Sequence, residues 1–190
     1  ISIRLYKAKV WVDRGVSVFL VDYRGYGKSE GKIAREDDLY LDAEAAVRWI
    51  GREKGIRRDQ IILYGESIGS APAIELATRD KFKGLVLEAP FASLAELARR
   101  HYPWVPVSFL VDFQFLNEEK IARIQAPVFI LHGTADEICP YAMGERLYRK
   151  APDPKDLFAV PDGMHNDLPE SAGEAYFDRP FKFLVERRGG

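Results

Sequence analysis

Cysteine is nearly absent from this sequence: Cys139 is the single one, so the chain has no internal disulfide framework. A lone thiol fits a reducing compartment and favours a cytoplasmic address, which a membrane anchor upstream of Ile1 would change. Cys139 is either a small buried apolar residue, the usual state of a free cysteine, or a reactive thiol.

Long apolar runs, an excess of one charge and metal-ligand spacings are absent as well. No stretch approaches the roughly 20 apolar residues of a membrane span, and no secretory signal pattern opens the chain. The 28 Lys and Arg residues nearly balance the 29 Asp and Glu residues, so we expect no nucleic-acid partner. The 3 histidines are too dispersed for a zinc motif, and we predict no metal and no cofactor.

The composition is that of one globular domain. With 190 residues, 47% hydrophobic and 30% charged, the chain can bury a sizeable core. Short apolar runs alternate with amphipathic stretches, which predicts an α/β fold with a mostly parallel sheet flanked by helices. Strands are expected at 16–21, 60–64, 85–89, 128–131 and 157–160. Helices are expected near 3–14, from 37 or 38 to Gly51 or Gly55, through Ala77, at 140–150, and at 170–187 with a kink near Pro180.

The most informative motif is Gly-Glu-Ser-Ile-Gly at 65–69, which directly follows the predicted strand at 60–64. A serine between two glycines at a strand-to-helix corner is held in a strained turn that exposes its hydroxyl. Ser67 is therefore a candidate nucleophile. Because a helix is expected to begin there, the backbone N–H of Ile68 would face a developing oxyanion.

Two further candidates follow other predicted strands. Asp136 lies just after the strand at 128–131, and His165 lies just after the strand at 157–160. Because the carboxyl ends of parallel strands share one edge of a sheet, Ser67, Asp136 and His165 are expected to meet there. Serine needs an imidazole to take its proton, and a carboxylate then orients the imidazole and stabilises the imidazolium.

The sequence resembles the α/β-hydrolase superfamily, and most closely its branch of small serine-aminopeptidase-like acyl hydrolases. The resemblance lies in residues 22–31 (DYRGYGKSEG), 65–69 (GESIG), 132–136 (HGTAD) and 163–167 (GMHND). It implies Ser67 as nucleophile, Asp136 as acid and His165 as base, within a single domain over residues 1–190.

One family feature is missing. Members of the family carry a strand and a His-Gly-rich loop ahead of the first helix, and that loop supplies a second oxyanion N–H. Here the chain opens directly in a helix whose face carries Ile3, Tyr6 and Val10. The missing strand would lie between those at 16–21 and 60–64, so we expect this domain to be an N-terminally incomplete part of a longer polypeptide.

The segment of about 91–117 is too long for a simple crossover and is interpreted as a small helical cap. Its aromatic residues Phe91, Trp104, Phe109 and Phe113 are candidates for lining an acyl pocket. The alternative is that these rings fill the core around a crossover helix, as aromatic side chains commonly do.

Other polar residues lie close in sequence to Ser67, Asp136 and His165 and are alternatives for the same catalytic roles. His132 comes too early in the motif order to be the base and is expected to hydrogen-bond near the Asp136 turn. Asp162 and Asp167 flank His165, but a triad acid normally arrives from another strand. Glu66 either shifts nearby pKa values or is an ordinary solvent-facing carboxylate.

Together these features predict a serine hydrolase that acts on a small-molecule ester, thioester or small amide through an acyl-enzyme. A non-catalytic binding or scaffold protein of the same fold is the alternative, because the loss of one oxyanion donor removes ~3 to 4 kcal/mol of transition-state stabilisation. The sequence leaves the oligomeric state open.

Overall fold

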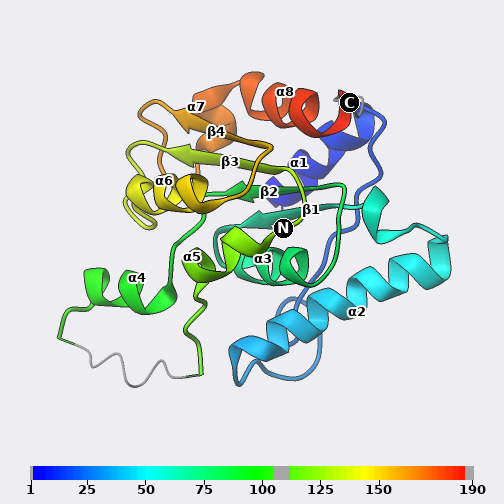
Figure 1. Ribbon diagram of the computed structural model, residues 1–190, viewed down its shortest axis with the longest axis horizontal. Helices are drawn as coiled ribbons and strands as arrows, with labels where there is room; N and C mark the ends of the chain where they lie inside the picture. The colour runs from blue at the N-terminus through cyan, green and yellow to red at the C-terminus, as the bar shows by residue number, and fades with distance from the viewer. Residues whose placement is uncertain (1, 105–111, 187–190) are drawn as a thin grey trace.

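A parallel sheet forms the centre of the molecule in the computed structural model, which describes residues 2–104 and 112–186. The sheet has the order β1-β2-β3-β4, and its strands are β1 (Ile62–Glu66), β2 (Gly84–Glu88), β3 (Val128–Gly133) and β4 (Lys155–Val160). All neighbouring pairs are parallel, so the carboxyl ends of the strands lie together at the left of Figure 1. The predicted fold class is confirmed.

The two central strands are buried along their whole length because helices cover both faces of the sheet. Every residue of β2 and β3 is buried, as expected for apolar runs in a doubly covered parallel sheet. Alternate residues face opposite sides: Leu85 and Leu87 belong to one core cluster, whereas Val86 and Phe129 belong to another.

The helices form a layer on each face. Three of them, α2 (Glu36–Lys54), α3 (Ser70–Arg79) and α6 (Tyr141–Lys150), contribute to the first cluster. The second cluster receives side chains from α1 (Ser2–Asp13), α7 (Leu168–Ala172), α8 (Ala175–Phe181) and the π-helical turn η5 (Lys182–Glu186). Figure 1 shows α1 and α8 on one side of the sheet and α2 and α3 on the other.

Local signals account for the helix ends. The carboxylate of Asp38 accepts hydrogen bonds from the backbone N–H groups of Ala34 (2.9 Å) and Arg35 (3.2 Å), which satisfies free donors at the start of α2. Gly55 ends α2 in the left-handed conformation at φ 66°, and the predicted helix over these residues is confirmed. Gly15, at φ 80°, likewise follows the end of α1.

The prediction of a strand at 16–21 is wrong for this structure. Residues 16–21 form no strand, and Phe19 and Leu20 are 47% and 50% exposed. Among the described residues no backbone hydrogen bond joins this segment to β1, the outermost strand of the sheet. Phe19 instead stacks on Trp49 of α2, with ring centroids 5.2 Å apart. An apolar run becomes a strand only where another strand offers it backbone partners.

The C-terminal helix also differs from the prediction. We expected one helix over 170–187 with a kink near Pro180, but α7 ends before Gly173, which has φ 55°. A second helix, α8, then contains Pro180, and the π-helical turn η5 follows it. Proline does remove a helical hydrogen bond here, but the positive φ of Gly173 breaks the helix earlier.

The segment after β2 contains α4 (Leu94–His101), and the chain then returns through α5 (Asn117–Lys120) and the short turn η4 (Ile121–Arg123). Arg146 of α6 ties the segment to the domain, because its guanidinium donates to Glu96 (2.6 and 2.7 Å) and Glu118 (2.5 and 3.1 Å). A third core cluster, which includes Phe91 and Phe115, lies where this segment meets α2 and α6.

The short turn η1 (Arg58–Gln60) precedes β1. Within residues 2–104 and 112–186, no helix combines the length and the apolar character that crossing a bilayer requires.

Candidate active site

Ser67 lies on a sharp turn between β1 and α3, in the short helical turn η2 (Ser67–Gly69). Its φ of 51° is in the left-handed region, which side chains with a Cβ rarely adopt. A Cβ on Gly65 would lie 2.6 Å from the carbonyl oxygen of Gly69 and 2.7 Å from Cα of Ser70. Glycine at position 65 is therefore what allows the chain to turn this tightly and to expose the serine hydroxyl.

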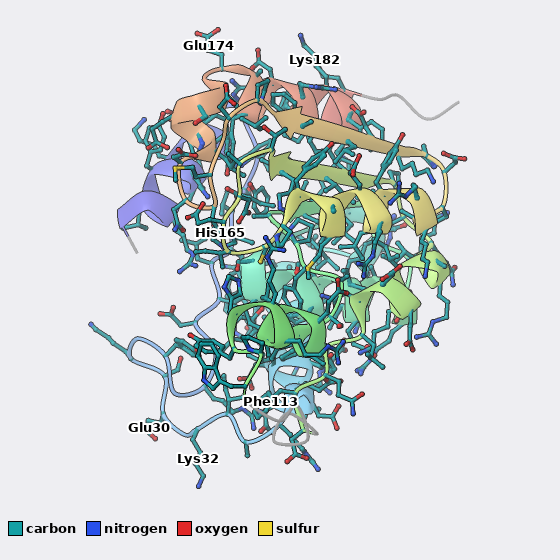
Figure 2. The ribbon with its side chains drawn as sticks, turned by 90° about the vertical axis from the view of Figure 1, so that its left-hand side faces the viewer. Glu30, Lys32, Phe113, His165, Glu174 and Lys182 are labelled. Atoms are coloured by element: carbon teal, nitrogen blue, oxygen red, sulfur yellow. The ribbon has the colours of Figure 1, made fainter. Side chains whose placement is uncertain are left out.

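Three side chains from three strand ends form one hydrogen-bonded series. His165 Nε2 lies 3.0 Å from the hydroxyl oxygen of Ser67, and His165 Nδ1 lies 2.8 Å from Oδ2 of Asp136. Figure 2 turns the side holding the carboxyl ends of the strands toward the viewer, and labels His165 near the middle of that side. The structure thus brings together the three residues that the sequence singled out.

The Asp136 carboxylate is held by several donors. Its Oδ1 accepts the backbone N–H groups of Ile138 (2.9 Å) and Cys139 (2.7 Å). Burial opposes the charged form, but hydrogen bonds from His132, His165 and the backbone of Cys139 outweigh burial and hold the pKa of Asp136 well below its usual range. The carboxylate is therefore ionised at neutral pH.

Burial lowers the pKa of His165, but its hydrogen bond to Asp136 and the negative charges of Asp136, Glu137 and Glu66 outweigh that effect. The net result is a raised pKa. The imidazole is therefore neutral, and able to accept a proton, only at a pH above the ordinary histidine value of about 6.5.

The loops that carry Asp136 and His165 are bonded to each other. The backbone N–H of Thr134 donates to the carbonyl of Val160, and that of Ala135 donates to the carbonyl of Gly163, both at 3.0 Å. The Thr134 hydroxyl also accepts the N–H of Asp162 at 2.9 Å. These bonds fix the separation of the loops that carry Asp136 and His165, independently of the contact between the two side chains.

His132 lies behind Asp136, as expected from the sequence. The ring is fully buried, and its Nε2 lies 2.7 Å from the carbonyl of Cys139 and 3.2 Å from Oδ2 of Asp136. Since a carbonyl oxygen only accepts, Nε2 carries the hydrogen, and Nδ1 has no hydrogen-bond partner in the described structure. His132 therefore supports the Asp136 turn and does not reach Ser67.

Cys139 is a buried neighbour of Ser67. Its side chain is 1% exposed. Burial and the charge of Asp136 raise the pKa of its thiol to about 12, although a contact with Ser67 opposes the shift. A neutral, enclosed thiol favours the interpretation of Cys139 as a small apolar residue over that of a reactive one.

The aromatic residues expected to line a pocket lie in different surroundings. Phe91 is 1% exposed and packs edge-on against Phe115 with centroids 6.1 Å apart, so it belongs to the core beneath the insert. Phe113 also packs against this core cluster, and in Figure 2 it lies well away from His165. Trp104 is 76% exposed, and Phe109 lies outside the described residues.

Sequence reasoning missed a second polar cluster beside Ser67, in which Lys7 of α1 contacts Glu66 and Glu88. One signal was present, because Glu88 interrupts the apolar run that forms β2.

Among the described residues there is no group of three or more His, Cys, Asp or Glu side chains arranged to hold a metal ion.

A serine on a strand-to-helix elbow, hydrogen-bonded to a histidine and an aspartate at the carboxyl edge of a parallel sheet, defines the α/β-hydrolase class. The profile of the family described as serine aminopeptidase, S33 matches residues 5–120 and 107–172. The chain belongs to this family.

Relatives in other organisms are similar over most of this chain. A protein of Mycobacterium tuberculosis is 40% identical over 172 residues, covering 90% of this chain and 61% of the relative. Alpha/beta hydrolase domain-containing protein 17B of Homo sapiens is 36% identical over 170 residues, covering 90% of this chain and 57% of the relative. The chain thus spans about three fifths of the length of these two relatives.

Solved structures share the fold. Acetyl xylan esterase 1 from Thermoanaerobacterium sp. JW/SL YS485 superposes with a TM-score of 0.71 at 19% identity, covering 95% of this chain and 69% of that one. An esterase of Pyrococcus furiosus gives 0.70 at 22% identity, covering 87% of this chain and 68% of that one. At these identities the similarity concerns the fold alone.

Proposed function

We propose that this chain carries the active site of a serine hydrolase that cleaves an ester, a thioester or a small amide through an acyl-enzyme. The observation that carries the proposal is the hydrogen-bonded series from Ser67 through His165 to Asp136, with contacts of 3.0 and 2.8 Å. Membership of a hydrolase family and structural similarity to esterases also support it.

In the proposed reaction, the Ser67 hydroxyl oxygen attacks the substrate carbonyl carbon while its proton passes to Nε2 of His165. The N–H of Ile68 stabilises the negative charge on the carbonyl oxygen. His165 then gives its proton to the leaving alcohol, thiol or amine, which leaves an acyl group on Ser67. Water, activated by the same imidazole, releases the acid. Asp136 keeps the imidazole in the required tautomer throughout.

The surroundings of the series favour an apolar acyl group. Ile68 follows Ser67, Ile138 follows Asp136 by two residues, and Met164 precedes His165. Their side chains are 42%, 38% and 47% exposed, respectively. These exposed apolar residues are close to each member of the series in sequence, and we infer that they offer an acyl chain apolar surface to cover on binding.

A fluorophosphonate probe tests the proposal directly, because it phosphonylates a serine only where the hydroxyl is activated. We expect stoichiometric labelling of the full-length protein and none of Ser67→Ala. Ser70→Ala is the matched control: Ser70 is buried three residues further on, its hydroxyl has no hydrogen-bond partner in the described structure, and it should label like wild type.

Turnover of p-nitrophenyl acetate and butyrate provides the second measurement. Wild type and Ser70→Ala should both release p-nitrophenol, and Ser67→Ala should fall to the background rate. If the folded wild-type protein neither labels nor turns over either ester, the proposal fails and a non-catalytic binding or scaffold role takes its place.

A further inference from the structure

A buried cation joins the first helix to the strand end that carries the nucleophile. Nζ of Lys7 in α1 donates to Oε2 of Glu66 at 3.0 Å and to both carboxylate oxygens of Glu88, at 2.9 and 3.0 Å. Glu66 and Glu88 are register partners at the carboxyl ends of β1 and β2, so the ammonium bridges two neighbouring strands. Lys7 is 8% exposed and Glu88 is 2% exposed.

Two tyrosine hydroxyls complete the surroundings of Glu88. Tyr64 donates to Oε2 of Glu88 at 2.8 Å and Tyr176 donates to the same oxygen at 2.7 Å. Burial, and then the charge of Glu88, raise the pKa of both tyrosines, so both remain neutral donors. The cluster is thus a buried ammonium with two carboxylates and two hydroxyls, every member of which has a partner.

This cluster reaches the active site through Glu66. Glu66 directly precedes Ser67 in the chain, and its charge is one of those that act on His165. Glu66 is less enclosed than Glu88: its side chain is 28% exposed, and its Oε1 lies 3.8 Å from the exposed guanidinium of Arg4. Lys7 is therefore the buried positive charge that offsets the carboxylate next to the nucleophile.

We propose that Lys7 is a positioning residue of the active site, which holds the Glu66 carboxylate in the buried cluster and limits the negative charge that His165 meets. This inference rests on the proposed function, because it concerns the base of that reaction. Its observable consequence is the pH at which His165 loses its proton. Among the described residues, the groups that act on His165 by hydrogen bond or charge include Asp136 and Glu137 from the loop after β3 and Glu66 and Ser67 from the elbow, and Cys139 contacts Ser67.

Changes at Lys7 and Glu66 should move that pH in opposite directions. Lys7→Gln keeps a hydrogen-bond donor but removes the positive charge, so His165 should hold its proton to a pH about 0.5 units higher. Glu66→Gln removes a negative charge, so His165 should release its proton at a pH about 0.5 units lower. Lys7→Arg retains the positive charge and should leave the His165 midpoint at its wild-type pH.

A merely structural Lys7 would give a different pattern. Loss of a helix anchor would weaken folding and lower the rate in both neutral variants, without moving the midpoints apart. The pH midpoint is therefore the discriminating readout, and the rate alone is not.

The experiment is an NMR titration of the His165 imidazole in the full-length protein, with the signal assigned from its absence in His165→Gln. Midpoints that separate in the predicted directions support the proposal. Equal midpoints, or shifts in the same direction, overturn it. If Lys7→Gln does not fold, Glu66→Gln alone still tests the proposal. An unchanged His165 midpoint in Glu66→Gln would show that the charge of the cluster does not act on His165, and would overturn the proposal.

The titration needs no turnover, so the two proposals fail separately. An absence of fluorophosphonate labelling in wild type, together with separated His165 midpoints, would count against the hydrolase and in favour of the electrostatic link. Labelling of wild type with unmoved midpoints would leave the hydrolase standing and remove the role assigned to Lys7.

Discussion

Substitution of Gly133 by alanine should disable the site without touching any of its three reacting side chains. Gly133 is the last residue of β3, three residues before Asp136. A Cβ at this position would lie 2.1 Å from the carbonyl oxygen of Gly163 and 2.9 Å from that of Met164. Those carbonyls belong to the two residues directly before His165, so the clash falls on the backbone that carries the imidazole.

The size of the effect follows from these distances. Real Cβ atoms stay beyond 3.0 Å, so a contact at 2.1 Å requires the two loops to separate by about 1 Å. Misplacement of a reacting group by about 1 Å can cost roughly 10²-fold in rate, and overpacking costs about 1–3 kcal/mol in stability. We expect kcat/KM for p-nitrophenyl butyrate to fall about 100-fold in Gly133→Ala, with a folded protein at 25 °C.

Gly51→Ala is the matched control. Gly51 lies inside α2, where an added Cβ would meet its nearest atom at 3.6 Å, an ordinary contact. This variant should keep full activity and gain about 0.5–1 kcal/mol in unfolding free energy, because alanine is the better helix former. A Gly133→Ala protein with wild-type kcat/KM would refute the argument that the spacing of the loops sets the catalytic geometry.

Three other outcomes can be measured. In urea denaturation, the unfolding free energy of Ser67→Gly should exceed that of Ser67→Ala by about 0.5–1 kcal/mol, because only alanine retains a Cβ at φ 51°. Equal stability of the two variants would show that the elbow is not strained. Wild-type activity should rise with pH through a midpoint above about 6.5, and Asp136→Asn should lower both the rate and that midpoint, because it removes the negative charge that raises the pKa of His165; an unchanged midpoint would contradict this assignment. Arg146→Ala should cost about 1 kcal/mol or less, since the guanidinium is partly exposed, and should speed amide exchange in α4 while leaving α3 unchanged; uniform exchange would mean that Arg146 does not anchor the insert.

The sequence was sufficient for elements that are specified locally. The apolar spacing and the glycine stop of α2 are properties of one stretch of chain, and so are the buried runs that became β2 and β3. The meeting of Ser67, Asp136 and His165 was predictable because each directly follows a strand, and parallel strands end at one edge.

Features that depend on distant partners were not predictable in this way. Residues 16–21 have the composition of a strand, but whether such a segment forms a strand depends on whether a neighbouring strand pairs with it. Nothing in the local pattern around Lys7 indicates that it reaches Glu66 and Glu88, which lie 59 and 81 residues away in sequence. The core position of Phe91 also depended on packing that composition does not specify.

The exposed apolar segment at residues 18–21, which pairs with no strand in the described structure, favours aggregation of the molecule. Val18, Phe19, Leu20 and Val21 are 38%, 47%, 50% and 39% exposed, and β1 is the outermost strand of the described sheet. An open strand edge and an exposed apolar segment are the ingredients of intermolecular cross-strand aggregation. Concentrated solutions of these 190 residues are therefore expected to turn turbid, and a charged gatekeeper such as Leu20→Lys should keep them clear.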